Sequence, residues 1–182
     1  WFERPLALEG RIAFVFPGEG AQYPNMMEGL CRQFPEVRRH FDLTAEALRL
    51  HGLTTPFGQI LFPQPAQVQA AEAALFGLEV AVAAVTAAGR GLLELMARLQ
   101  VVPHAIVGHS SGEFGALLAA GAYKAASEEQ SIEAIRWGAE SARQLEHSKL
   151  VPKASLLSVG GVDPAALEGV LRDAGGRLVV AM

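Results

Sequence analysis

A serine between two glycines is the residue of this chain whose neighbours best suit it to chemistry. Residues 108–112 read Gly-His-Ser-Ser-Gly, which fits the pattern G-x-S-x-G. In that pattern a strand turns sharply into a helix, and small residues two positions to either side let the turn push the serine oxygen outward. Such a hydroxyl can act as a nucleophile. The pattern predicts Ser110 as the nucleophile, and an ordinary serine on a glycine-lined turn is the alternative.

The sequence on either side of this serine favours the strand and the helix that the turn requires. Residues 105–107 are a short apolar run, typical of the end of a buried strand. From Ser111 onward helix formers dominate, and Phe114, Leu117 and Leu118 are spaced for one helical face. This context makes the nucleophile interpretation stronger than the short pattern alone would.

A second loop that could face a ligand follows the first predicted strand. Residues 11–16 favour a buried strand that ends at Pro17, and residues 18–22 read Gly-Glu-Gly-Ala-Gln. Two glycines leave backbone N–H groups free to face a ligand, although a plain connecting loop is the alternative. The loop lacks the further glycine and the lysine of phosphate-cradling patterns.

The composition indicates a packed globular protein. Of the 182 residues, 51% are hydrophobic and 19% are charged, so the chain can bury a sizeable core. A net charge of −4 without any basic block argues against a nucleic-acid partner. The single cysteine, Cys31, excludes an internal disulfide and suits a reducing compartment, so we expect a cytoplasmic protein.

Two further features concern the context of the chain. It opens at Trp1 without Met or a signal peptide, which suggests a piece of a longer polypeptide. The most apolar stretch, residues 70–97, includes four charged side chains, namely Glu72, Glu79, Arg90 and Glu94. A membrane span tolerates few of those, so we expect one or two buried helices and no membrane partner.

Helical sequence dominates the rest of the first 147 residues. The predicted helices cover residues 26–31, 35–50, 67–100 and 128–145. Within the third of these regions we expect breaks at Gly77 and around residues 89–91. Residues 54–65 contain three prolines and are predicted to form a loop.

The sequence pattern changes after residue 147, where the predicted elements become shorter. Residues 148–153 resemble a linker, and residues 155–159 favour a strand. Asp163 is placed to cap a helix over residues 164–174, and residues 177–181 begin another strand. We expect a short β-α-β unit here, the start of a second domain.

Three features in this order resemble the acyltransferase domains of polyketide and fatty-acid synthases and the malonyl-CoA:acyl-carrier-protein transacylases. They are Pro-Gly-Glu-Gly-Ala-Gln at 17–22, Gly-His-Ser-Ser-Gly-Glu at 108–113, and the β-α-β unit after the linker. The resemblance covers nearly the whole chain. It implies an α/β fold class: an α/β-hydrolase-like core with a parallel sheet, followed by the start of a ferredoxin-like small subdomain.

The resemblance also implies boundaries for these parts. Residues 1–10 would be a linker and residues 11–147 the acyltransferase core. Residues 148–153 would be a second linker, and residues 154–182 the first, incomplete part of the ferredoxin-like subdomain.

The activity that the resemblance implies is acyl transfer in two steps. A short acyl group, malonyl or a simpler one, moves from CoA to Ser110 and then to the phosphopantetheine thiol of an acyl carrier protein. Dividing the transfer in this way avoids bringing two large thiols together. Neighbouring synthase domains, such as a ketosynthase, would be further partners, and no cofactor or metal would be bound. The alternatives are a serine hydrolase of esters or acyl thioesters, because G-x-S-x-G serves both, and a decayed, non-catalytic acyltransferase.

Specific roles follow from the same resemblance. Backbone N–H groups of Glu19 and Ser111 would form the oxyanion hole, and a donor of this kind contributes roughly 10²–10³ in rate. The N-terminus of the helix that starts at Ser111 would add its dipole. The acyl pocket would involve five residues: His109, Gln22, Val82, Arg136 and Trp137.

The chain departs from the family first in its general base. In the family this is a histidine beyond the inserted subdomain, and the chain ends at Met182 before that point. His109 adjoins the nucleophile, but neighbours on such a turn point apart, so it suits a pocket better than a base. We therefore expect little activity from this portion alone.

The second departure concerns the residues that bind the acyl group. The family holds a malonyl carboxylate with an arginine on the helix after the nucleophile, because a planar guanidinium binds a carboxylate bidentately. That position falls on Trp137 or Gly138, and Arg136 would face elsewhere. Val82 stands where the family has a glutamine, and Glu19 where a glutamine is more usual. These changes weaken the assignment of malonyl and strengthen that of an uncharged acyl group, whereas the resemblance to the family as a whole still favours malonyl.

Overall fold

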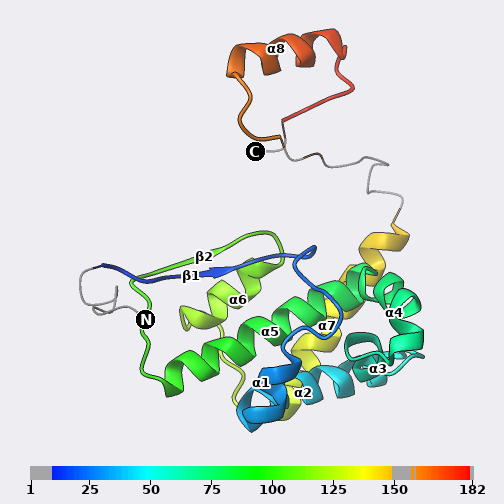
Figure 1. The fold of residues 1–182 in the computed structure, drawn as a ribbon, viewed down its shortest axis with the longest axis vertical. Helices are drawn as coiled ribbons and strands as arrows, with labels where there is room; N and C mark the ends of the chain where they lie inside the picture. The colour runs from blue at the N-terminus through cyan, green and yellow to red at the C-terminus, as the bar shows by residue number, and fades with distance from the viewer. Residues whose placement is uncertain (1–9, 149–156, 158, 181–182) are drawn as a thin grey trace. The chain divides into compact units, whose positions relative to one another are not determined.

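The computed structural model describes residues 10–148, 157 and 159–180. The chain divides into two compact units, Trp1–Ser148 and Lys149–Met182. In the first unit, a small sheet lies on a group of helices (Figure 1). The described part of the chain is mostly helical and contains a small parallel sheet. Helices together with a parallel sheet agree with the α/β class that the sequence predicts.

The sheet has two parallel strands, β1 (Ala13–Phe16) and β2 (Ala105–Gly108). The register pairs Ala13 with Ala105 at one end and Phe16 with Gly108 at the other. Both strands are predicted from the sequence, and both are confirmed as strands. The expectation that they are buried is wrong, because Ala13, Val15, Ala105 and Val107 are exposed and only Phe16 of the two strands is buried. Because they are parallel, their carboxyl ends lie at one edge, so the loop after β1 and the turn after β2 meet there.

Nine helical elements occupy the described residues. They are α1 (Glu28–Gln33), α2 (Pro35–His51), α3 (Phe57–Leu61), the 3₁₀ turn η2 (Pro65–Gln67), α4 (Val68–Leu75), α5 (Leu78–Arg98), α6 (Gly112–Ala119), α7 (Glu128–His147) and α8 (Pro164–Asp173). In the first unit α6 packs under both strands, α5 packs on α6, and α2 and α7 pack on α5 (Figure 1).

The core of the first unit lies where α2, α5 and α7 meet. Leu48 of α2 and Ala84 of α5 are fully buried there, and many of the other buried residues of α5 are alanine or valine. Such small side chains let helices approach closely. By length and composition α5 is the one helix of the described residues that could cross a membrane, yet its apolar face packs against α2 and α7. Core packing explains its composition.

Of the two breaks predicted in the helical region 67–100, one is present in the structure and one is not. The break at Gly77 is confirmed, because α5 starts directly after it. The break at residues 89–91 is wrong, because α5 continues through both glycines. A Cβ on Gly89 would lie 3.1 Å from Cδ1 of Phe16, and one on Gly91 would lie 3.0 Å from Cγ1 of Val37. These glycines therefore allow close packing and do not interrupt the helix.

The predicted loop at residues 54–65 contains the short helix α3, so the loop assignment is partly wrong. Phe57, Ile60 and Leu61 are buried, and this tertiary packing stabilises a turn of helix that its prolines would not suggest. The first helix starts later than predicted, at Glu28, because Met27 adopts a left-handed conformation with φ 65°.

The second unit contains α8, which the sequence predicts. Its cap is confirmed: the Asp163 side chain accepts a hydrogen bond of 3.1 Å from the backbone N–H of Ala165. The strand predicted at 177–181 is wrong over the described residues 177–180, which form no strand. A strand needs a hydrogen-bonded neighbour. The strand at 155–159, apart from residues 157 and 159, lies outside the described residues, as do most of both predicted linkers.

Candidate active site

The turn between β2 and α6 holds Ser110 in an unusual backbone conformation. Ser110 has φ 53°, in the left-handed region that residues with a side chain seldom adopt. Two hydrogen bonds close the turn: Gly112 N–H to the His109 carbonyl at 2.9 Å, and Glu113 N–H to the Ser110 carbonyl at 3.0 Å. Ser110 is exposed. Strain of this kind persists only where the surroundings enforce it, and it is frequent at active sites.

The two glycines of the pattern have no room for a side chain. A Cβ on Gly108 would lie 2.6 Å from Cα of Glu113, and one on Gly112 would lie 2.1 Å from the Phe16 carbonyl oxygen. Both contacts are with backbone atoms, which cannot rotate away. The first turn of α6 therefore packs directly on the ends of both strands, and this close packing aims Ser110 out of the turn.

The glycine loop after β1 lies against the nucleophile. The N–H of His109 donates to the Phe16 carbonyl at 3.0 Å, so the two segments stay joined where the strands end. A Cβ on Gly18 would lie 2.8 Å from the His109 carbonyl oxygen and 2.9 Å from Cβ of Ser110. Gly18 thus allows the loop to contact the nucleophile directly.

Gln22 fixes the far end of this loop. It is buried, and its Oε1 accepts a hydrogen bond of 2.7 Å from the Gly20 N–H. Its Nε2 donates to the Leu75 carbonyl, at the end of α4, at 3.4 Å. The sequence predicts Gln22 as an acyl-pocket residue, and in the structure both ends of its amide bind the protein itself.

Replacing Gln22 should loosen the loop. We expect Gln22→Ala to lower the free energy of unfolding by about 1–3 kcal/mol, because the buried amide loses both partners. Urea unfolding monitored by circular dichroism measures this. Gln69→Ala, at an exposed glutamine of α4, is the matched control and should change stability by less than about 0.5 kcal/mol. Equal stability of the two variants would contradict the role of Gln22.

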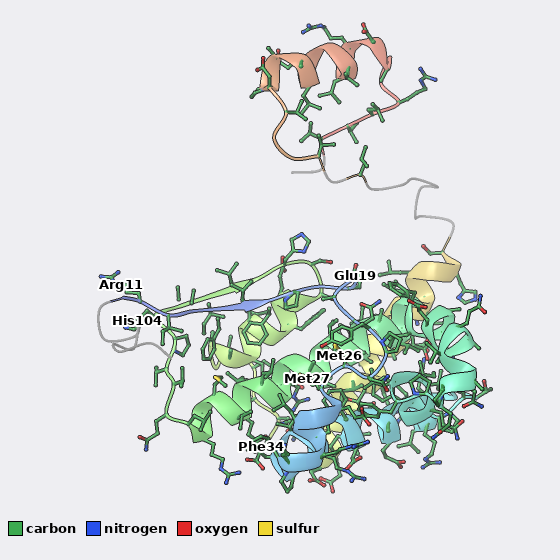
Figure 2. All side chains as sticks on the ribbon, in the orientation of Figure 1. Arg11, Glu19, Met26, Met27, Phe34 and His104 are labelled. Atoms are coloured by element: carbon green, nitrogen blue, oxygen red, sulfur yellow. The ribbon has the colours of Figure 1, made fainter. Side chains whose placement is uncertain are left out.

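The Glu19 carboxylate is the principal hydrogen-bond acceptor of the site. Ser110 Oγ donates to its two oxygens at 3.2 and 3.1 Å, and Ser111 Oγ donates at 2.8 Å. In return the Glu19 N–H donates to Ser111 Oγ at 3.1 Å. Figure 2 shows Glu19 beyond the end of β1, in the loop that leads away from the sheet.

These donors shift the acidity of Glu19. The hydrogen bond from the Ser111 hydroxyl has the largest effect and lowers the pKa of the carboxyl group. Its own backbone N–H, the Ser110 hydroxyl and the Ser111 backbone N–H also lower the pKa, and burial opposes them. The carboxylate is therefore charged at neutral pH.

The structure brings together Glu19, Ser110 and Ser111, and it does so more tightly than the sequence predicts. The sequence assigns only the backbone N–H groups of Glu19 and Ser111 to the site. It misses the carboxylate of the first and the hydroxyl of the second. The acidic residue between two glycines of a ligand-facing loop is the signal that could have found this contact.

The other predicted pocket residues are less closely connected. Val82 is half-buried on α5, His109 has an exposed side chain, and Trp137 is 67% exposed. Arg136 pairs with Glu133 at 3.0 Å on its own helix. Over the described residues, no recorded hydrogen bond or ion pair joins Val82, Arg136 or Trp137 to Ser110.

An apolar groove of about 440 Å³ starts beside the turn. Ser111 and Gly112 line one part of it, and Val85, Gly89 and Leu92 of α5 line another. No charged side chain is among its lining residues. Over the described residues there is also no group of three or more His, Cys, Asp and Glu side chains that could hold a metal ion.

Comparison with known proteins identifies a matching family and similar sequences. The family model described as "Acyl transferase domain" matches residues 13–149. The highly reducing polyketide synthase srdA of Neurospora crassa is 36% identical over 125 residues, which are 64% of this chain and 5% of that protein. The malonyl CoA-acyl carrier protein transacylase of Bacillus subtilis is 34% identical over 116 residues, which are 62% of this chain and 32% of that protein. The chain thus spans a minor part of these relatives.

Solved structures share the fold. A malonyl-transacylase in complex with a type II polyketide-synthase acyl-carrier protein matches with a TM-score of 0.65 at 20% identity, over 93% of this chain and 50% of that chain. The acyl transferase domain of SpnD, in complex with 2-(pent-4-yn-1-yl)malonyl, matches with a TM-score of 0.52 at 28% identity, over 78% of this chain and 30% of that chain.

Proposed function

The chain belongs to the acyl transferase domain family, and we propose that it transfers a short acyl group from CoA to Ser110 and on to an acyl carrier protein. The observation that carries the proposal is Ser110, exposed at φ 53° on a strand-to-helix turn and in contact with the glycine loop. We place this transfer in polyketide or fatty-acid synthesis, since relatives of both kinds match.

The reaction takes two steps at one oxygen. Ser110 Oγ attacks the thioester carbonyl of acyl-CoA, the C–S bond breaks, and the CoA thiol leaves with a proton. The phosphopantetheine thiol of the carrier protein then attacks the acyl-serine ester, the C–O bond breaks, and Ser110 regains its proton. The backbone N–H groups of Glu19 and Ser111 stabilise the oxyanion of each step, helped by the N-terminus of α6.

Several finer points belong to the same proposal. Residues 11–147 form an α/β-hydrolase-like core and residues 154–182 the start of a ferredoxin-like subdomain, with residues 1–10 and 148–153 as linkers. The general base is a histidine outside this chain. The carrier protein and neighbouring synthase domains are the partners, the compartment is the cytoplasm, and no cofactor is bound.

Incubation with radiolabelled acyl-CoA tests the function, with and without holo carrier protein. A transferase should pass the label from the acyl-serine to the carrier thiol, and the carrier should reduce the loss of acyl groups to water. Hydrolysis that the carrier does not reduce would favour the esterase alternative. Failure to acylate the complete domain would favour the non-catalytic alternative, which the replaced pocket residues Val82 and Trp137 also suggest.

Acyl choice gives a separate prediction. Acetyl-CoA or propionyl-CoA should acylate Ser110 at least as fast as malonyl-CoA, because Trp137 or Gly138 stands where the family has its carboxylate-binding arginine and Arg136 already pairs with Glu133. Initial acylation rates measured by mass spectrometry give the ratio.

Arg136→Ala should leave this ratio unchanged, as should Arg32→Ala, a control at an exposed arginine that also pairs on its own helix. A strong malonyl preference that disappears only in Arg136→Ala would contradict the prediction and make Arg136 the carboxylate ligand.

A further inference from the structure

We propose that the Glu19 carboxylate occupies the oxyanion position of the resting site and slows acylation of Ser110 until it moves into solvent. This inference rests on the proposed function, because it assigns the site's donors to an acyl oxyanion. It makes Glu19 a residue that determines how readily the nucleophile reacts.

The carboxylate lies directly against the nucleophile. It accepts hydrogen bonds from both hydroxyls of the turn, Ser110 at 3.2 and 3.1 Å and Ser111 at 2.8 Å. In acylation the carbonyl carbon of the thioester bonds to Ser110 Oγ, and its oxygen must then lie beside that atom, near the backbone N–H groups that stabilise it. The carboxylate and the reacting carbonyl group therefore compete for the space beside Ser110 Oγ.

The surroundings of the carboxylate also favour its negative charge. The backbone N–H groups of Glu19 and Ser111 both favour the charged form of this carboxylate and lower its pKa. The Glu19 N–H also donates to Ser111 Oγ, so it is engaged in the resting site. Charge-assisted hydrogen bonds are about twice as strong as neutral ones. A charged occupant is therefore harder for an incoming thioester to displace than a neutral one.

The carboxylate can leave without moving the backbone. Glu19 is exposed, and among the described residues it has no ion pair that would tie it to another element. Within the described part of the chain, only two neighbouring residues of one turn, Ser110 and Ser111, bind it through their side chains. A rotation about the Glu19 side-chain bonds opens the position and leaves Gly18 in contact with Ser110.

The same facts argue against Glu19 as the general base. A base works best when its pKa lies near the working pH, whereas the hydroxyl of Ser111 and the nearby N–H groups lower the pKa of Glu19. The groups that act on the carboxylate are these hydroxyls and N–H groups, and among the described residues its side-chain hydrogen-bond partners are Ser110 and Ser111. The carboxylate stays charged from about pH 5 to about pH 9.

The experiment compares Glu19→Gln with wild type, both as the complete domain with its histidine, using an alkyl fluorophosphonate that labels serine. In that reaction Ser110 Oγ forms a bond to phosphorus, fluoride leaves, and the serine proton goes to solvent. We expect labelling of Glu19→Gln to be about tenfold faster, since a neutral amide holds the position less strongly. The ratio should stay constant from about pH 5 to about pH 9, because the charge does not change there. Glu72→Gln, an exposed glutamate of α4, is the control for the charge change and should label like wild type.

Each outcome decides the question. Labelling of Glu19→Gln that is equal to or slower than labelling of wild type overturns the proposal. The proposal also fails if the labelling rate of wild type rises with pH and that rise is absent in Glu19→Gln, because Glu19 would then be a base. No labelling of either protein also overturns it, because Ser110 would then not be an accessible nucleophile. Faster labelling of Glu19→Gln without acylation by any acyl-CoA supports the role of Glu19 and instead refutes the proposed acyl transfer.

Discussion

Ser110→Ala is expected to abolish formation of the acyl-enzyme, lowering acylation by at least about 10³-fold. The substitution removes the one oxygen on which the acyl group would be carried and leaves the backbone of the turn intact. Mass spectrometry of the protein after incubation with acyl-CoA measures the loss. Ser141→Ala, on α7 and away from the turn, should acylate like wild type.

A second substitution separates reactivity from folding. Ser110→Gly also removes the hydroxyl, but glycine adopts φ 53° without the cost that a side chain imposes. We expect this variant to be as inactive as Ser110→Ala and more stable than wild type, by about 1 kcal/mol. Acyl label that persists in either variant would mean that another residue is the nucleophile, and the proposed function would lose its main support.

The sequence predicts the turn and its strand and helix because their causes are local. Gly108 is a glycine for a steric reason that acts within a few residues, because a Cβ there would meet Glu113, and the pattern of residues 105–118 contains this reason directly. The steric reason at Gly112 comes from Phe16 and Pro17, which are distant in sequence, so at that position the pattern gives only the residue type. The parallel pairing of β1 with β2 is different. No local sequence pattern indicates that these two strands pair in parallel, and this expectation comes only from the resemblance to a family with a parallel sheet.

Non-local packing explains the errors. Gly89 and Gly91 look like helix breakers in the sequence, but they lie where Phe16 and Val37 approach α5. The helix α3 exists because its apolar side chains are buried, although its prolines suggest a loop. In each case a distant contact outweighs the local preference, and a local pattern cannot contain that information.

At the active site, the contact of the Glu19 carboxylate with the turn is likewise non-local and could not be predicted from a local pattern. The loop pattern predicts which backbone groups face a ligand, because glycines allow the close approach. Whether the side chain between those glycines turns toward the nucleophile depends on Ser111, about ninety residues away in sequence. The sequence therefore finds the residues of the site but misses the contact between them.

Gly112→Ala should destabilise the protein more than any other substitution of the turn. The added Cβ would lie 2.1 Å from the Phe16 carbonyl oxygen and 2.6 Å from the Pro17 carbonyl oxygen, and neither backbone atom can rotate away. Either α6 separates from β1 or the turn changes shape. We expect a loss of about 3 kcal/mol or more in the free energy of unfolding, at the upper end for an overpacked site.

The control for this prediction is Gly29→Ala on α1, where a Cβ would have no neighbour within 4 Å. Alanine favours a helix over glycine by about 1 kcal/mol, so this variant should be slightly more stable than wild type. Urea unfolding of both variants gives the comparison. Because Gly112 also aims Ser110 out of the turn, any folded fraction of Gly112→Ala should acylate poorly. A Gly112→Ala protein with wild-type stability and acylation would show that the contact between α6 and the end of β1 does not position the nucleophile.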